Sequence, residues 1–295
     1  MARVHRPSPG LADHLVELYD GFPFDRSLAE DPLSCVRPFA ADRRAGEIAG
    51  IVAATLAIGN TTAIRGSFEA LVARVGRDLP VFVEARTRGN WSSVLPGFKH
   101  RWIRGDQLGY LAWRLREIYE THGSLEEVFL EGWEANGGFA GGLDALAGAL
   151  RGPPGAGPSA APAGYPHLFP SPVDRAHSAC KRETLFVRWM ARERYPDLGL
   201  WRRVPMGELR VPLDQHVFWI AYHMGMTQRR TRDWTAVEEV SEALRRIDPL
   251  DPVRYDFVLC HTGISGDCPK TRDIAVCGPC SLRPDCRLWR GRRAA

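Results

Sequence analysis

The stretch Ser178-Ala-Cys-Lys-Arg-Glu-Thr-Leu-Phe-Val-Arg-Trp-Met-Ala-Arg192 has the apolar spacing of a helix, which we expect to end near Tyr195, before Pro196. It contains Lys181, and only three of the 39 lysine and arginine residues of the chain are lysines. An amine differs from a guanidinium because it can lose its proton and attack carbon. Lys181 is therefore a candidate nucleophile, with a plain solvated side chain as the alternative.

The helical pattern continues on both sides of this stretch. Downstream, Asp214 precedes the apolar run 217–221, which predicts that Asp214 is the N-cap of a helix. No segment alternates with period two over more than a few residues. The sequence therefore predicts an all-α fold. Further helices are expected at 11–20, 41–56, 61–75, 106–122, 236–247 and 254–261. Ser124 and Glu127 form a capping-box pattern, which predicts the start of another helix.

Length and composition indicate a globular protein. With 295 residues and 44% apolar content, the chain can bury one large core or two smaller ones. The net charge of +4 favours a polyanionic partner only if the charges cluster. The first residues do not resemble a signal peptide, and the longest apolar run, 48–58, is too short to cross a bilayer. We expect a cytoplasmic protein without membrane association, with a mobile Gly/Pro/Ala-rich loop at 151–164.

Five of the seven cysteines lie between residues 260 and 286. An odd number of cysteines without a secretion signal argues against a disulfide framework and for a metal site. Successive members of the set Cys268, Cys277, Cys280 and Cys286 are separated by eight, two and five residues, within a loop that contains Pro and Gly. Four thiolates suit either a tetrahedral zinc ion or a 4Fe-4S cluster, and spacing alone does not decide between them.

The run from Cys277 to Cys286 resembles the C-terminal iron-sulfur loop of endonuclease III and its adenine glycosylase relatives, which belong to the helix-hairpin-helix DNA glycosylase superfamily. The resemblance implies a 4Fe-4S cluster held by the four cysteines of this loop. The first spacing is longer here than in that family, which leaves Cys260 or His261 as competing ligands. Structural zinc remains the alternative cofactor.

Lys181 and Asp214 lie in segments that are similar to the catalytic segments of the same superfamily. Ser-Ala-Cys-Lys-Arg followed by Pro-Leu-Asp-Gln-His resembles its bifunctional members, and the 33 positions from Lys181 to Asp214 are nearest to the archaeal 8-oxoguanine glycosylase pattern. Residues from about 40 to 265 also resemble an uncharacterised bacterial branch of the superfamily. The resemblance implies that Lys181 forms a Schiff base with the sugar and that Asp214 stabilises positive charge there. A plain N-cap remains the alternative for Asp214.

The same resemblance implies several DNA contacts. Asn60 resembles the asparagine that fills the gap left by a flipped nucleotide, with a helix C-cap that has Asn or Gly in a left-handed conformation as the local alternative. His216 would contact a phosphate or make a hydrogen bond in the core. The segment 168–177 lacks the glycines of the usual hairpin, so Arg175 and Arg182 would take over its phosphate contacts. Four aromatic residues are candidates for stacking on an extruded base, with the core as their commoner place: Trp189, Trp201, Trp219 and Phe98.

These expectations describe a two-lobed helix-hairpin-helix glycosylase fold with a C-terminal four-cysteine loop. A helical barrel at 41–204 would carry the hairpin and Lys181, and 1–40 plus 205–295 would form the second lobe. The implied function is removal of an oxidised purine such as 8-oxoguanine from double-stranded DNA, with AP lyase activity, by a monomer associated with the nucleoid. The alternative, which the atypical hairpin favours, is a non-catalytic nucleic-acid-binding module with a structural metal centre.

Overall fold

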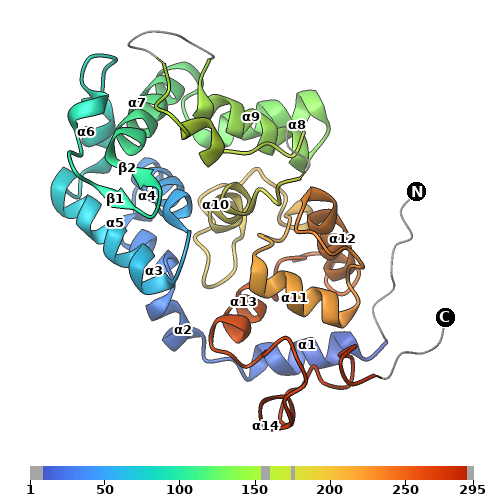
Figure 1. Ribbon diagram of the computed structural model, residues 1–295. Helices are drawn as coiled ribbons and strands as arrows, with labels where there is room; N and C mark the ends of the chain where they lie inside the picture. Colours follow the sequence, from blue (N-terminus) through green and yellow to red (C-terminus); the bar gives the residue numbers. More distant parts are fainter. Residues whose placement is uncertain (1–8, 154–159, 174–176, 291–295) are drawn as a thin grey trace. The chain divides into compact units, whose positions relative to one another are not determined.

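The computed structural model describes residues 9–153, 160–173 and 177–290 (Figure 1). Helices make up 58% of these described residues and strands 1%, so the predicted all-α class is confirmed. Part of the loop predicted at 151–164 lies outside the described residues. None of the described helices is long and apolar enough to cross a membrane.

The chain divides into two compact units. The smaller unit consists of residues 1–24, 176–181 and 205–295, and the larger unit of residues 25–175 and 182–204. The helical barrel expected at 41–204 stays a prediction, and each of the two units combines segments that are separated along the chain. In particular, the segment that ends at Lys181 groups with the smaller unit.

The larger unit contains short and long helices, and the two strands described in it pair antiparallel with Lys99 opposite Arg104. The elements are α2 (Phe24–Glu30), α3 (Leu33–Val36), η1 (Arg37–Phe39), α4 (Arg43–Leu56), α5 (Thr61–Val75), α6 (Leu79–Glu84), η2 (Trp91–Ser93), β1 (Lys99–His100), β2 (Ile103–Arg104), α7 (Gly105–His122), α8 (Leu125–Asn136), α9 (Phe139–Arg151), η4 (Tyr165–Leu168) and α10 (Lys181–Ala191).

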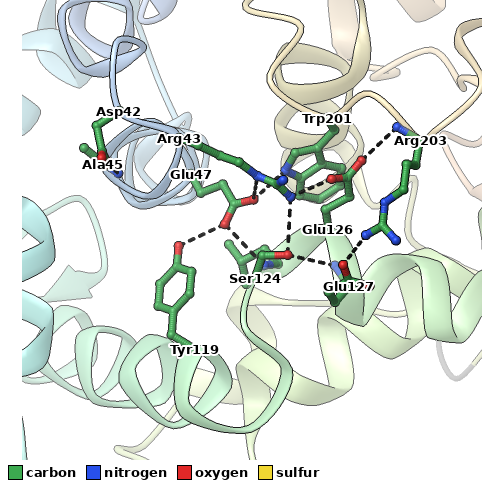
Figure 2. Close-up of polar contacts among 11 residues, drawn as sticks. Asp42, Arg43, Ala45, Glu47, Tyr119, Ser124, Glu126, Glu127, Trp201 and Arg203 are labelled. Atoms are coloured by element: carbon green, nitrogen blue, oxygen red, sulfur yellow. Dashed lines mark hydrogen bonds and ion pairs between the residues drawn. The ribbon is translucent and has the colours of Figure 1, made fainter.

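Helix α4 runs through the core of the larger unit. Its N-cap is Asp42, whose carboxylate accepts a hydrogen bond from the Ala45 amide at 2.6 Å, and every residue from Ala45 to Leu56 is buried. The helix also buries one carboxylate, that of Glu47, which accepts hydrogen bonds from Trp201 and Tyr119 (Figure 2). The helix expected at 41–56 is therefore present, and its Ala- and Ile-rich sequence suits its burial.

The smaller unit contains α1 (Leu11–Asp20), η5 (Met206–Glu208), α11 (Gln215–Met224), α12 (Trp234–Arg245), α13 (Asp256–Ile264) and α14 (Ile274–Cys277). Aromatic rings join its first segment to α13: Phe24 stacks on Phe257 with ring centroids 5.8 Å apart. A second link connects α1 to the cysteine-containing loop, because His14 Nδ1 lies 2.6 Å from the buried carboxylate of Asp285.

Candidate functional site

Lys181 is the first residue of α10, three residues after the predicted helix start at Ser178. The delay has a local cause, since Cys180 has a positive φ of 46° and so interrupts right-handed helix. The Ser178 hydroxyl accepts a hydrogen bond from the Cys180 amide at 3.1 Å, which fixes this turn. The Lys181 side chain is half-buried.

Asp214 is the N-cap of α11, as predicted: its Oδ1 accepts a hydrogen bond from the Val217 amide at 2.8 Å. Its other oxygen, Oδ2, accepts a hydrogen bond from the Cys260 thiol on α13 at 3.3 Å. Each carboxylate oxygen has a second lone pair, so the group keeps capacity for a further donor or for a cationic centre. Sequence analysis assigned no contact to this thiol, which lies 46 positions downstream of Asp214.

His216, two residues after Asp214, packs against α13. A Cβ built on Gly263 would lie 2.8 Å from the His216 Nδ1, so only glycine allows this approach. The Nδ1 atom is buried and has no hydrogen-bond partner among the described residues. The core hydrogen bond considered for His216 is therefore not made by this nitrogen.

The four cysteines of the C-terminal loop influence one another electrostatically. Burial raises the pKa of the Cys268, Cys280 and Cys286 thiols, and the neighbouring thiols raise the pKa of each further. Within the described residues, no three His, Cys, Asp or Glu side chains form a group that could hold a metal ion. The four cysteines of this loop therefore match a four-thiolate centre, an iron-sulfur cluster or zinc, in the chemistry of their donor atoms and not in a gathered geometry.

Asn60 begins α5 as its N-cap, with its Oδ1 accepting a hydrogen bond from the Ala63 amide at 2.8 Å. Of the two residues considered for a left-handed conformation here, Asn and Gly, Asn60 does not adopt it, because its backbone is extended. The preceding residue, Gly59, takes the positive φ of 106° instead. Asn60 is exposed, so the described surface around it is open to a ligand.

A two-stranded hairpin, β1–β2, lies beside the Gly59–Asn60 connection (Figure 1). Buried His100 holds it there: its Nε2 lies 3.1 Å from the Ile58 carbonyl oxygen and its Nδ1 lies 2.8 Å from the Ser67 hydroxyl. The hairpin turn carries Trp102, with the guanidinium of Arg182 5.8 Å from its ring centre. Two residues expected to contact DNA, Asn60 and Arg182, thus flank the same hairpin, whereas Arg175 lies outside the described residues.

The aromatic residues considered for base stacking are mostly core residues. Trp189, Trp201 and Phe98 are buried. Trp219 is half-buried in the smaller unit and stacks on His223, with ring centroids 6.2 Å apart. The exposed indole is Trp102 in the larger unit, which the sequence analysis did not single out.

In the described parts of 152–180, before Lys181, the structure has no short hairpin between two helices. Helix α9 ends at Arg151, and the helical element described between it and α10 is the single turn η4, Tyr165–Leu168. Residues 174–176 of the expected hairpin segment lie outside the described residues. The phosphate-binding amides of a glycine-rich hairpin therefore have no counterpart in the part of 152–180 that the structure describes.

A separate cavity of about 620 Å³ opens in the larger unit, a volume within the usual range for small-molecule sites. Burial raises the pKa of the Cys35 thiol at its wall, against the opposing effect of a hydrogen bond with Arg65. Cys35 is therefore held as a thiol and is a poor candidate for a nucleophile. The cavity is lined by Ala29, Ser34, Cys35, Pro38, Phe39, Arg65, Phe68, Glu69, Val72, Ala73, Gly76 and Arg77.

The fold and these sites define a mostly helical, two-unit protein with a helix-initiating lysine, a capping aspartate and a cysteine-rich loop. Residues 31–265, more than half of the chain, match the model of the family described as protein of unknown function (DUF2400), and the chain belongs to this family. No curated protein and no solved structure matches the chain.

Proposed function

We propose that this protein is a DNA repair glycosylase with associated AP lyase activity, which acts on an oxidised purine such as 8-oxoguanine in double-stranded DNA. Lys181 is the nucleophile and Asp214 the carboxylate that stabilises the sugar. Such a protein would work as a monomer in the cytoplasm, at the nucleoid.

The chemistry requires an amine and an anion close to the same sugar. The Lys181 nitrogen, once deprotonated, donates its lone pair to C1′, and the bond from C1′ to the base breaks, with its electron pair leaving on the base, which takes up a proton. Loss of a proton from the new C1′–N linkage and opening of the sugar ring give a Schiff base. The Asp214 carboxylate stabilises the positive charge that develops on the sugar.

One observation carries this proposal: Lys181 and Asp214 belong to the same compact unit. The segment 176–181 groups with residues 205–295 even though Lys181 is also the first residue of α10, whose remaining residues group with the larger unit. The carboxylate of Asp214 is fixed by two donors, from Val217 and Cys260, and so is held in one orientation. A preoriented anion stabilises a developing cation more strongly than one that must reorganise.

The cysteine loop supports the proposal through its donor set. Cys268, Cys277, Cys280 and Cys286 would hold a 4Fe-4S cluster, or zinc as the alternative, and binding would stabilise the fold of the loop. The hydrogen-bonded contact between His14 and Asp285 connects this loop to α1, so order in the loop would extend to the smaller unit.

Borohydride trapping tests the role of Lys181. Because the chain has only two other lysines, Lys99 and Lys270, three single variants examine every lysine side chain. The wild type, Lys99→Gln and Lys270→Gln should become covalently linked to a duplex with an abasic site in the presence of borohydride. Lys181→Gln should lose the link while keeping its folded circular-dichroism spectrum. Undiminished trapping of Lys181→Gln would exclude Lys181 as the nucleophile.

A non-catalytic nucleic-acid-binding module is the second candidate function. The absence of a short hairpin in the described part of 152–180 favours it, because the usual phosphate grip of the glycosylases is missing there. A panel of duplexes, each with a single lesion, separates the two functions. Release of a damaged base or strand cleavage supports the glycosylase, whereas binding without turnover on the whole panel supports the module.

A further inference from the structure

We propose that the β1–β2 hairpin is a DNA-contact element in which Trp102 stacks on a base that has lost its partner and Arg101 binds a phosphate. The inference rests on the proposed function in one respect, that the ligand is DNA. It assigns to the larger unit a base-stacking residue.

The hairpin presents its side chains in two sets. His100 and Ile103 are buried and anchor it, whereas Lys99, Arg101 and Trp102 are exposed. Both ring nitrogens of His100 are engaged, with the Ile58 carbonyl and the Ser67 hydroxyl, so the turn is attached to the connection between α4 and α5. An exposed indole on a rigid support loses little conformational freedom when a base stacks on it.

Trp102 is one of the few large apolar side chains at the surface, with 46% of its area exposed. The neighbouring Arg182 places its guanidinium 5.8 Å from the indole ring centre. Stacking of bases on aromatic rings with arginine beside them is the usual way in which proteins bind unpaired nucleotides.

The turn itself is strained. Arg101 has a φ of 56°, at the first central position of a two-residue hairpin turn, where glycine is preferred. Strain of this kind persists when the surrounding structure enforces it, and it is frequent at functional sites. Here the guanidinium lies against Gly59, since a Cβ built on that glycine would be 2.7 Å from the Arg101 Nη2. The long cation is therefore directed along the Gly59–Asn60 connection.

The charges of the hairpin suit a polyanion. Within the described residues, Lys99 and Arg101 make no ion pair, whereas Arg104 is paired with Asp106 at 2.9 Å. Two uncompensated cations on the same short hairpin as an exposed indole offer a nucleic-acid strand both phosphate contacts and a surface for base stacking.

The test compares two duplexes in fluorescence anisotropy: one fully paired, and one with a tetrahydrofuran abasic analogue that leaves a single unpaired base. The wild type should prefer the second duplex. The preference is the ratio of the Kd values for the two duplexes. Trp102→Ala should reduce this ratio roughly tenfold, and Trp102→Phe should keep most of it. Arg101→Ala should weaken binding to both duplexes equally and reduce the slope of log Kd against log salt by about one.

Tyr195→Ala is the matched control, because Tyr195 is an aromatic residue of the same unit with the same 46% exposure; it should bind like the wild type. An unchanged preference in Trp102→Ala overturns the proposal. The proposal is also overturned if Trp102→Phe and Tyr195→Ala lose the preference for the abasic duplex equally, or if the wild type binds neither duplex.

The tetrahydrofuran site cannot form a Schiff base, so this test does not depend on Lys181. A Trp102 effect without borohydride trapping would refute the proposed catalysis alone. Trapping by Lys181 without a Trp102 effect would refute the hairpin inference alone.

Discussion

Glu183, in the first turn of α10, is a buried carboxyl group, and no other described residue donates a hydrogen bond to either of its oxygens. Its side chain is 1% exposed, and burial raises its pKa from 4.5 to about 7 against the opposing charges of Arg182 and Arg151. The folded protein therefore holds a proton on this group at pH values at which the unfolded chain has released it.

We expect this group to make the protein less stable as the pH rises from about 4.5 to about 7. In that window the folded state binds more protons than the unfolded state, so the free energy of unfolding falls, by on the order of 3 kcal/mol over the whole window, and levels off above it. Glu183→Gln should not show this fall in the free energy of unfolding and should be more stable than the wild type at pH 8. Urea unfolding at pH 5, 6, 7 and 8 measures the free energy of unfolding of both proteins.

Glu69→Gln, at an exposed position, is the control for the change in net charge. Parallel pH profiles for the wild type and Glu183→Gln would show that Glu183 does not hold its proton in the folded state.

At the scale of elements, Glu47 joins four parts of the larger unit (Figure 2). From α4, it accepts hydrogen bonds from Trp201 Nε1 at 2.7 Å, the Tyr119 hydroxyl at 3.1 Å and the Leu125 amide at 3.2 Å. Arg43, one turn earlier, lies 2.5 Å from Glu126 and extends the network to α8. Each donor comes from a different element, so the carboxylate fixes their relative positions.

Glu47→Gln should destabilise the protein by about 3 kcal/mol, because the amide NH₂ would face donors and the Arg43 cation would lose one partner. Trp201→Phe removes one donor and should cost about 1 to 2 kcal/mol, and the two changes together should be less than additive. Glu120→Gln disrupts an exposed pair with Arg116 and should cost less than about 1 kcal/mol. Equal unfolding midpoints for Glu47→Gln and Glu120→Gln would contradict a central role for Glu47.

The sequence allowed the long periodic helices to be predicted, and it failed where packing overrides propensity. Helix α9 contains Gly141, Gly142 and Gly148 and was not predicted. Gly141 and Gly142 have a structural cause, because α8 and α9 approach backbone to backbone: a Cβ on Gly141 would lie 2.6 Å from the Gly132 carbonyl oxygen, and one on Gly142 would lie 2.7 Å from that of Phe129. Side-chain periodicity carries no signal for such a contact.

The candidate site also combines features that could be predicted from the sequence with features that could not. The N-cap at Asp214 could be predicted because capping depends on residues three positions apart. The contact of Cys260 with Asp214 and the attachment of the hairpin through His100 and Ser67 join residues 46 and 33 positions apart. Local patterns do not contain such pairs, and for this reason Trp102 was not recognised from the sequence.

For the whole molecule, the decisive measurement concerns the cysteine loop. Protein purified without oxygen should be brown, with broad visible absorbance and bound iron and sulfide, and chelation or Cys280→Ser should abolish the colour and lower the stability of the smaller unit. Cys35→Ser, in the larger unit, is the matched control and should remain brown. A colourless preparation with one zinc ion per chain would instead establish the zinc alternative.

The two units use different segments of the chain, and this affects the order in which they can fold during synthesis at the ribosome. Apart from 176–181, the larger unit is a continuous stretch that is complete once residue 204 has emerged, whereas the smaller unit needs residues 205–295 to close around the segment that ends at Lys181. Domains generally fold as they emerge, in order from the N-terminus. A nascent chain would thus acquire the hairpin surface before the residues 205–295 that group with the segment ending at Lys181, and a chain interrupted between the two stages would present the first without the second.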